Sequence, residues 1–295
     1  MQKEDGKFID AGGIRTHYYE KGDGPPLILF HGGAFGHPTA ADSAWDWSTN
    51  FDDLAERYRV IAVDKLGQGF TDNPKSDSDY CMAAVVEHAA DLLHALGVGP
   101  ADLVGHSRGG YLTCRLTLDH PELVRSCTIV DRNTSSPGVE LNGIVLGNPP
   151  EPRLSRESHK WIFEHYSYSP NHITSDWLDI CCEVATLPKY QEARDKMETE
   201  GLGIKQFTPG LAADKSKMFA MLRDEGLKRP TQIIWGKNDP TASIEQGWVL
   251  WDLVAKHRSD AQFHIINQAG HFSYREHPKQ FNELIHAFVA NSEVG

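Results

Sequence analysis

The chain has 295 residues, of which 40% are hydrophobic and 24% are charged, a composition typical of soluble globular proteins that can bury a sizeable core. Its formal net charge of -12 argues against a surface that binds nucleic acid or an anionic membrane, but it does not exclude an anionic small substrate. There is no apolar signal segment, no run approaches the ~20 apolar residues of a membrane span, and the five cysteines lack CxxC spacing. We therefore expect a cytoplasmic protein with reduced thiols.

The first half of the chain predicts a hairpin, followed by strands that alternate with helices. The residues on either side of Gly12-Gly13 predict a β-hairpin over 8–20. Helical patterns cover 84–96 and the segment from 108 to about 120. Continuous apolar runs predict strands buried on both faces at 27–30, 59–63, 102–106 and 127–131.

This alternation predicts the α/β class, with a mostly parallel central sheet and helices on both of its faces. Ligand sites in such folds lie beyond the C-terminal ends of the strands. Ser107 and the segment 131–133 each lie at the end of a predicted strand. We therefore expect both at the same edge of the sheet.

The pattern changes after about residue 133, where helical segments separated by prolines replace the strand-like runs. The core pattern then resumes with predicted strands at 231–235 and 262–266, a helix over about 244–256 and an amphipathic helix from Pro278. The predicted domains are a first part of the core (1–134), a helical insertion after the sixth strand (135–229) and a second part of the core (230–295). We interpret the insertion as a lid over the site, because it begins at the C-terminal end of a strand; a subdomain that serves stability alone is the alternative.

The segment 105–109 reads Gly-x-Ser-x-Gly between a predicted strand and a predicted helix. This is the pattern of a nucleophile elbow, a sharp turn that lifts a serine hydroxyl above the end of a sheet. Glycine suits both outer positions, because a Cβ there would clash with the neighbouring backbone. The pattern alone also fits an ordinary loop serine, so the presence of a base, an acid and an oxyanion hole must decide.

Candidates for these partners follow other predicted strands. A serine nucleophile needs a base for its proton, a carboxylate that orients the base, and N–H donors for the oxyanion. Asp239 follows the strand that ends at 235, and His271 follows the last strand, which is the chain order expected after an elbow serine. We predict that the N–H groups of Gly33 and Arg108 form the oxyanion hole. Alternatively, Asp239 is an ordinary turn residue, and the loop at 31–33 is only a tight turn at the end of the strand.

With these motifs the chain resembles the α/β-hydrolase superfamily and, within it, the meta-cleavage product hydrolases, which split C–C bonds in 2-hydroxy-6-oxo-dienoates from aromatic degradation. The resemblance covers the core well and the lid poorly, and its segments are 31–33, 59–64, 67–72, 105–109, 235–239 and 269–278. It implies a catalytic triad of Ser107, Asp239 and His271, a small-molecule substrate, and no metal or organic cofactor. A homodimer is the default expectation for the assembly.

The chain departs from this family's pattern at three places. His106 and Arg108 flank the nucleophile where the family usually has Asn and Met. Phe272 follows His271 where the family usually has Trp. Cys181 stands at about the place of the family's lid arginine, with no arginine nearby.

Without a lid arginine, a carboxylate on the substrate needs another cation. Arg108 and Arg132 both follow predicted strands that end at the pocket, so we expect one of them to bind the carboxylate. The alternative is that Arg108 pairs with a neighbouring acid and does not meet the substrate. We further expect Gly32, Ala34 and Phe272 to contact the substrate.

The predicted function is serine-dependent hydrolysis of a C–C bond in a meta-cleavage product. The main alternative is a carboxylesterase or lactonase, which uses the same triad for plain acyl transfer and needs no carboxylate anchor. A non-catalytic small-molecule-binding protein is a further alternative, against which the complete triad argues. An epoxide hydrolase or dehalogenase is disfavoured, because those enzymes have Asp where this chain has Ser107.

Overall fold

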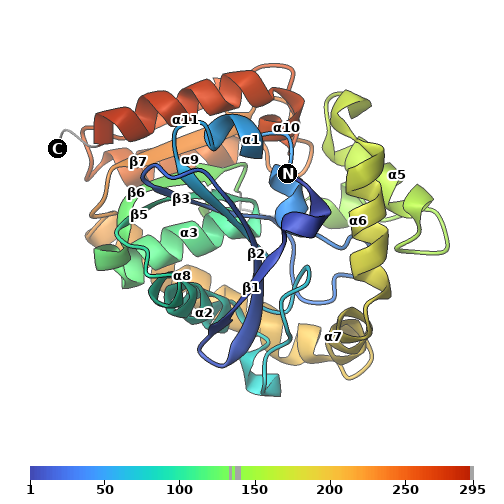
Figure 1. Cartoon of the computed structure of the whole chain (residues 1–295). Coiled ribbons are helices and arrows are strands. Elements are labelled where there is room, and N and C mark those ends of the chain that lie inside the picture. The colour runs from blue at the N-terminus through green and yellow to red at the C-terminus, as the bar shows by residue number, and fades with distance from the viewer. Residues whose placement is uncertain (133–134, 137–140, 293–295) are drawn as a thin grey trace.

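Figure 1 shows the computed structural model of the chain, which describes residues 1–132, 135–136 and 141–292. An eight-stranded sheet crosses the molecule in the order β1-β2-β4-β3-β5-β6-β7-β8. The β1–β2 and β2–β4 pairs are antiparallel and the other pairs are parallel, which confirms the predicted mostly parallel sheet. The strands are β1 (Lys7–Ala11), β2 (Ile14–Lys21), β3 (Pro26–Phe30), β4 (Arg59–Val63), β5 (Ala101–His106), β6 (Val124–Val130), β7 (Thr231–Gly236) and β8 (Gln262–Ile266).

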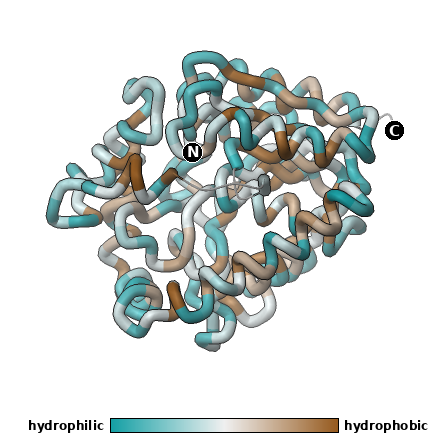
Figure 2. The backbone as a smooth tube through the Cα atoms, turned by 180° about the vertical axis from the view of Figure 1, so that it is seen from behind, coloured by the Kyte–Doolittle hydropathy of each residue, from teal (hydrophilic) through white to brown (hydrophobic). Residues whose placement is uncertain are grey.

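Helices cover both faces of the sheet (Figure 1). One hydrophobic cluster lies under α2 (Met82–Ala95), α3 (Arg108–Asp119), α8 (Thr208–Asp224) and α9 (Ile244–Ala255). The other lies under α1 (Phe51–Leu54), α10 (Ser273–Glu276) and α11 (Pro278–Ser292). Figure 2 shows hydrophobic and hydrophilic residues alternating along the outer helices. Because both faces are covered, β5 is buried along its whole length, which explains its continuous apolar run.

The chain between β6 and β7 forms the predicted helical insertion. Besides α8 it contains α4 (Asn142–Val145), α5 (Arg156–Tyr166), α6 (Ser175–Thr186) and α7 (Pro188–Glu198). In Figure 1, α5, α6 and α7 stand together at one side of the molecule, whereas α8 returns to pack against α2, α3 and α9. The predicted domain boundary after residue 134 lies outside the described residues. None of the helices in the described ranges combines the length and apolar character needed to cross a bilayer.

A stack of aromatic side chains joins the insertion to the core. Trp177 of α6 is fully buried, and its ring lies parallel to that of Phe163 with centroids 3.9 Å apart. Its indole N–H donates to a carboxylate oxygen of Asp46 at 2.8 Å, and Asp46 lies in a short 3-10 helix of the core (Ala44–Trp47). The indole therefore both fills the interface and satisfies a buried acceptor.

We expect Trp177→Ala to lower the free energy of unfolding by about 3–5 kcal/mol, because the substitution leaves a cavity and an unsatisfied carboxylate. Urea denaturation monitored by circular dichroism measures the change. Trp248 is the matched control, since its side chain is 49% exposed. A Trp177→Ala variant as stable as Trp248→Ala would show that the interface contributes little.

Candidate active site

Ser107 occupies the turn from β5 into α3 with φ +52° and ψ -124°, a conformation that non-glycine residues rarely adopt. Its N–H donates to the carbonyl of Val130 at 2.9 Å. A Cβ at Gly105 would collide with the carbonyl of Gly109, and one at Gly109 with the carbonyl of Phe30. Glycine at both positions therefore permits the strained elbow, which holds the serine at the C-terminal edge of the sheet.

The structure brings Asp239 and His271 together from the loops after β7 and β8. Nδ1–H of His271 donates to Oδ2 of Asp239 at 2.6 Å, and both side chains are buried. The other carboxylate oxygen accepts the N–H groups of Thr241 and Ala242, each at 2.8 Å. This arrangement orients the imidazole and leaves Nε2 to act as the base.

Ser107 and His271 line one cavity. Within the described residues, no hydrogen bond joins their side chains. Such hydrogen bonds are often long before the substrate binds.

Two aromatic residues, Tyr166 and His106, contact His271. The His271 N–H donates to the carbonyl of Tyr166 at 2.8 Å, and the two rings stack with centroids 4.7 Å apart and planes 19° from parallel. His106 Nε2–H donates to the His271 carbonyl at 2.7 Å. Burial places the pKa of His106 well below its usual value, so this ring is neutral. His271 is thus fixed by both the insertion and the core.

The loop after β3 has the geometry of an oxyanion loop. His31 is fully buried; its Nδ1–H donates to the Gly32 carbonyl at 2.8 Å, and its Nε2 accepts the Lys65 N–H at 3.2 Å. Burial lowers the pKa of His31 to about 3, so the ring stays neutral in this arrangement. Gly33 has φ +74°, and no hydrogen bond within the described residues occupies its N–H or that of Arg108. These two N–H groups remain available to a substrate oxygen.

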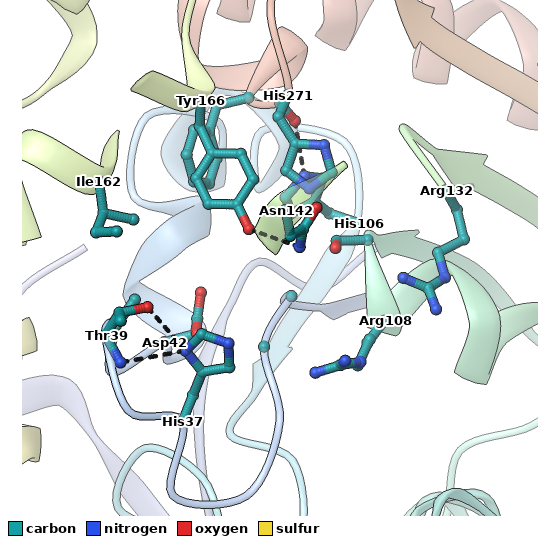
Figure 3. A pocket seen from close by; sticks show the side chains of 15 residues that line it. His37, Thr39, Asp42, His106, Arg108, Arg132, Asn142, Ile162, Tyr166 and His271 are labelled. Atoms are coloured by element: carbon teal, nitrogen blue, oxygen red, sulfur yellow. Dashed lines mark hydrogen bonds between the residues drawn. The ribbon is translucent and has the colours of Figure 1, made fainter. Parts of the chain in front are cut away.

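A cavity of about 510 Å³, counted with its opening to solvent, lies against Ser107 and His271 (Figure 3). Gly32, Arg132 and Phe272 line it, as expected for substrate-binding residues. Ala34 does not line the cavity, so its assignment as a substrate contact is corrected. After the turn at Gly33 its methyl group packs instead into the hydrophobic cluster under α2 and α3.

Arg108 also lines the cavity, and it has no counter-ion among the described residues. Its Nε is buried without a hydrogen-bond partner, and its guanidinium carbon lies 5.4 Å from the centre of the Phe207 ring. The alternative in which Arg108 pairs with a neighbouring acid is therefore not seen among the described residues. A half-buried guanidinium without a counter-ion is suited to bind an anion.

The structure adds residues that the sequence analysis did not assign to the site. Asp42, Tyr166 and Asn142 line the cavity, and Lys65 Nζ donates to the Gly33 carbonyl at 3.0 Å. Asp42 follows an irregular loop, and Tyr166 and Asn142 belong to the insertion, so no local pattern connects them with Ser107. Lys65 is the second residue after the end of β4, which is the signal that could have suggested it.

Comparisons with known proteins agree with this geometry. A family model described as the alpha/beta hydrolase fold matches residues 25–278. The 2-hydroxymuconate semialdehyde hydrolase of Pseudomonas sp. strain CF600 is 30% identical over 294 residues, which cover 99% of this chain and 96% of that protein. The 2-hydroxy-6-oxo-2,4-heptadienoate hydrolase of Pseudomonas putida is 27% identical and covers 98% of both chains.

A solved structure extends the likeness to three dimensions. The meta-cleavage product hydrolase of Pseudomonas fluorescens IP01 has a TM-score of 0.79 to this chain at 26% identity, and the match covers 99% of this chain and 100% of that one. The likeness therefore extends through the insertion as well as the core. Together with the elbow and its Asp–His pair, these matches show that the chain is a serine hydrolase of the α/β-hydrolase family, related over nearly its full length to meta-cleavage product hydrolases.

Proposed function

We propose that this protein hydrolyses a C–C bond in a 2-hydroxy-6-oxo-dienoate, a vinylogous 1,5-diketone formed in aromatic degradation. The observation that carries the proposal is the half-buried Arg108 guanidinium, which lines the cavity of Ser107 and His271 without a counter-ion among the described residues. A dienoate has a carboxylate at one end and a ketone at the other. The names of the relatives, which include a hydrolase of 2-hydroxy-6-oxo-2,4-heptadienoate, support this substrate class.

The reaction requires two stages at one site. The dienol first ketonises: its 2-hydroxyl loses a proton and C5 gains one, which places a carbonyl in conjugation with the bond to be broken. Ser107, with His271 as base and Asp239 orienting it, then attacks the C6 carbonyl directly or activates water, and the Gly33 and Arg108 N–H groups receive the oxyanion. The C5–C6 electron pair passes into the conjugated carbonyl, so the products are a carboxylic acid and a 2-hydroxydienoate.

Arg108→Ala is expected to raise KM for the dienoate about 10- to 100-fold, because it removes a charge-assisted contact with the carboxylate. Steady-state kinetics with the anionic dienoate measure the change. The same measurement on Arg132→Ala compares the other cavity arginine. Unchanged KM values in both variants would rule out an arginine anchor at this end of the cavity.

Product analysis tests the proposed reaction. We expect the protein to convert 2-hydroxy-6-oxo-2,4-heptadienoate into acetate and a five-carbon 2-hydroxydienoate in equal amounts, as measured by NMR and mass spectrometry. Loss of the substrate without these two fragments would contradict C–C hydrolysis.

One observation favours the alternative of a carboxylesterase or lactonase. The position expected for the lid arginine of the family is Cys181, which is fully buried, and the described insertion residues that line the cavity are Asn142, Ile162 and Tyr166. Among the described residues, the insertion therefore contributes no cationic side chain to the cavity, which suits a neutral ester as substrate.

A further inference from the structure

The carboxyl group of Asp42 lies beside the predicted oxyanion hole. A Cβ on Gly33 would collide with this carboxyl, so the group packs directly against the glycine whose N–H faces the reaction. Asp42 lines the same cavity as Ser107, His271 and Arg108. Figure 3 shows Asp42 and Arg108 on opposite sides of the cavity, with His271 and Tyr166 above them.

This carboxyl has no direct side-chain partner among the described residues, although the charges of Lys65 and Arg108 act on it. Within the described residues no other side chain hydrogen-bonds to it, and the contact it makes is with its own backbone N–H. A half-buried carboxylate that lines a reactive cavity and lacks a side-chain partner among the described residues is available to a substrate. The triad does not use it.

The charges around Asp42 suit a proton acceptor. Burial raises the pKa of Asp42, which makes the group a stronger base near neutral pH, while the positive charges of Lys65 and Arg108 oppose this rise. The titratable groups that sense its charge lie on several elements, namely Lys65, Arg108, His271, Asp46, Cys181, Tyr190 and Tyr274.

We propose that Asp42 is the base that takes the proton from the 2-hydroxyl group of the dienol substrate, and so is a catalytic residue of the ketonisation stage. The inference rests on the proposed function. The O2–H bond breaks and an Asp42 O–H bond forms; the electron pair left on O2 forms the C2 carbonyl. The two double bonds shift along the chain, and C5 takes a proton from water, after which Asp42 returns its own proton to solvent.

In this scheme a different base acts in each stage: Asp42 in ketonisation and His271 in cleavage. In the dienoate the carboxylate and the 2-hydroxyl stand on adjacent carbons, so a carboxylate bound by Arg108 holds the hydroxyl within the cavity that Asp42 also lines. Nδ1 of His271 is held by Asp239, and its Nε2 must be unprotonated to accept the Ser107 proton. If His271 also took the enol proton, it would enter the cleavage stage as imidazolium. A separate carboxylate keeps it neutral.

Deuterium exchange in a Ser107→Ala background tests this inference, because that background stops before cleavage. The probe is 2-hydroxy-6-oxo-2,4-heptadienoate in D2O, and NMR follows deuterium entering C5 above the rate without protein. We expect Asp42→Asn in this background to lower the exchange rate at saturating substrate by about 100-fold or more. The dissociation constant of the substrate should rise by less than about tenfold. Asp23→Asn, at an exposed surface position, is the matched control and is expected to exchange normally.

The outcomes separate the inference from the proposed function. An exchange rate at saturation that Asp42→Asn leaves unchanged would overturn the inference and leave C–C hydrolysis standing. A fall in exchange explained wholly by weaker binding would overturn it as well, since Asp42 would then only hold the substrate. If the Ser107→Ala protein does not bind the dienoate, the proposed function fails, and the inference fails with it.

Discussion

Ser107→Ala is expected to lower kcat for the preferred substrate by about 10⁴- to 10⁶-fold, because no other group in the elbow can take over the attack. Residual turnover should come from the oxyanion donors and from substrate binding alone. Steady-state assays at high protein concentration measure the remaining rate. Mass spectrometry after treatment with a fluorophosphonate provides a second measurement, since only the protein with Ser107 should gain the adduct.

The strained backbone at Ser107 supplies a control for this variant. Alanine keeps the unfavourable φ of +52°, so Ser107→Ala should unfold at nearly the same urea concentration as the parent chain. Glycine relieves the strain, and Ser107→Gly should be more stable by about 1 kcal/mol while equally inactive. A Ser107→Ala variant that is folded and retains more than a tenth of the activity would show that Ser107 is not the nucleophile.

The second large effect concerns Asp239. Asp239→Asn is expected to lower kcat about 10³- to 10⁴-fold, because an amide that donates toward Nδ1 favours the tautomer with the proton on Nε2. Thr241 and Ala242 donate to the other carboxylate oxygen of Asp239, so the amide oxygen should take that place and the amide N–H₂ should face His271. Kinetic assays at several pH values measure the loss.

A second buried carboxyl makes this result informative. Asp131 follows β6, but its oxygens already accept the Gly236 N–H and the Ser273 hydroxyl, at 2.5 Å each. It is therefore not free to orient His271. Activity of Asp239→Asn within about tenfold of the parent would instead mean that another acid, such as Asp131, can serve the histidine.

The sheet, and the placing of Ser107, Asp239 and His271 at one edge of it, were predictable from local patterns for a physical reason. A buried parallel strand reads as a continuous apolar run, and parallel strands end at one edge of the sheet. Ser107, Asp239 and His271 each follow such a run, so their meeting did not depend on any long loop. The same rule located the Gly33 loop after β3.

The wall of the cavity was not predictable in this way. Asp42 depends on the path of an irregular loop, and Tyr166 depends on how α5 packs onto the loop after β8, neither of which has a periodic signal. The error at Ala34 has the same origin, because the left-handed turn at Gly33 directs the next side chain into the core. The edge of the sheet at which these loops meet was predictable, whereas the direction of each side chain within a loop depends on the tertiary path and was not.

The most direct test of the account compares kcat/KM for 2-hydroxy-6-oxo-2,4-heptadienoate with that for p-nitrophenyl acetate on the same preparation. Loss of the dienoate chromophore and release of nitrophenolate are both followed by absorbance, in the parent chain and in Ser107→Ala. We predict that the dienoate is strongly preferred and that both reactions disappear in the variant. Rapid turnover of the ester with no bleaching of the dienoate would contradict the proposed C–C hydrolase and favour an esterase.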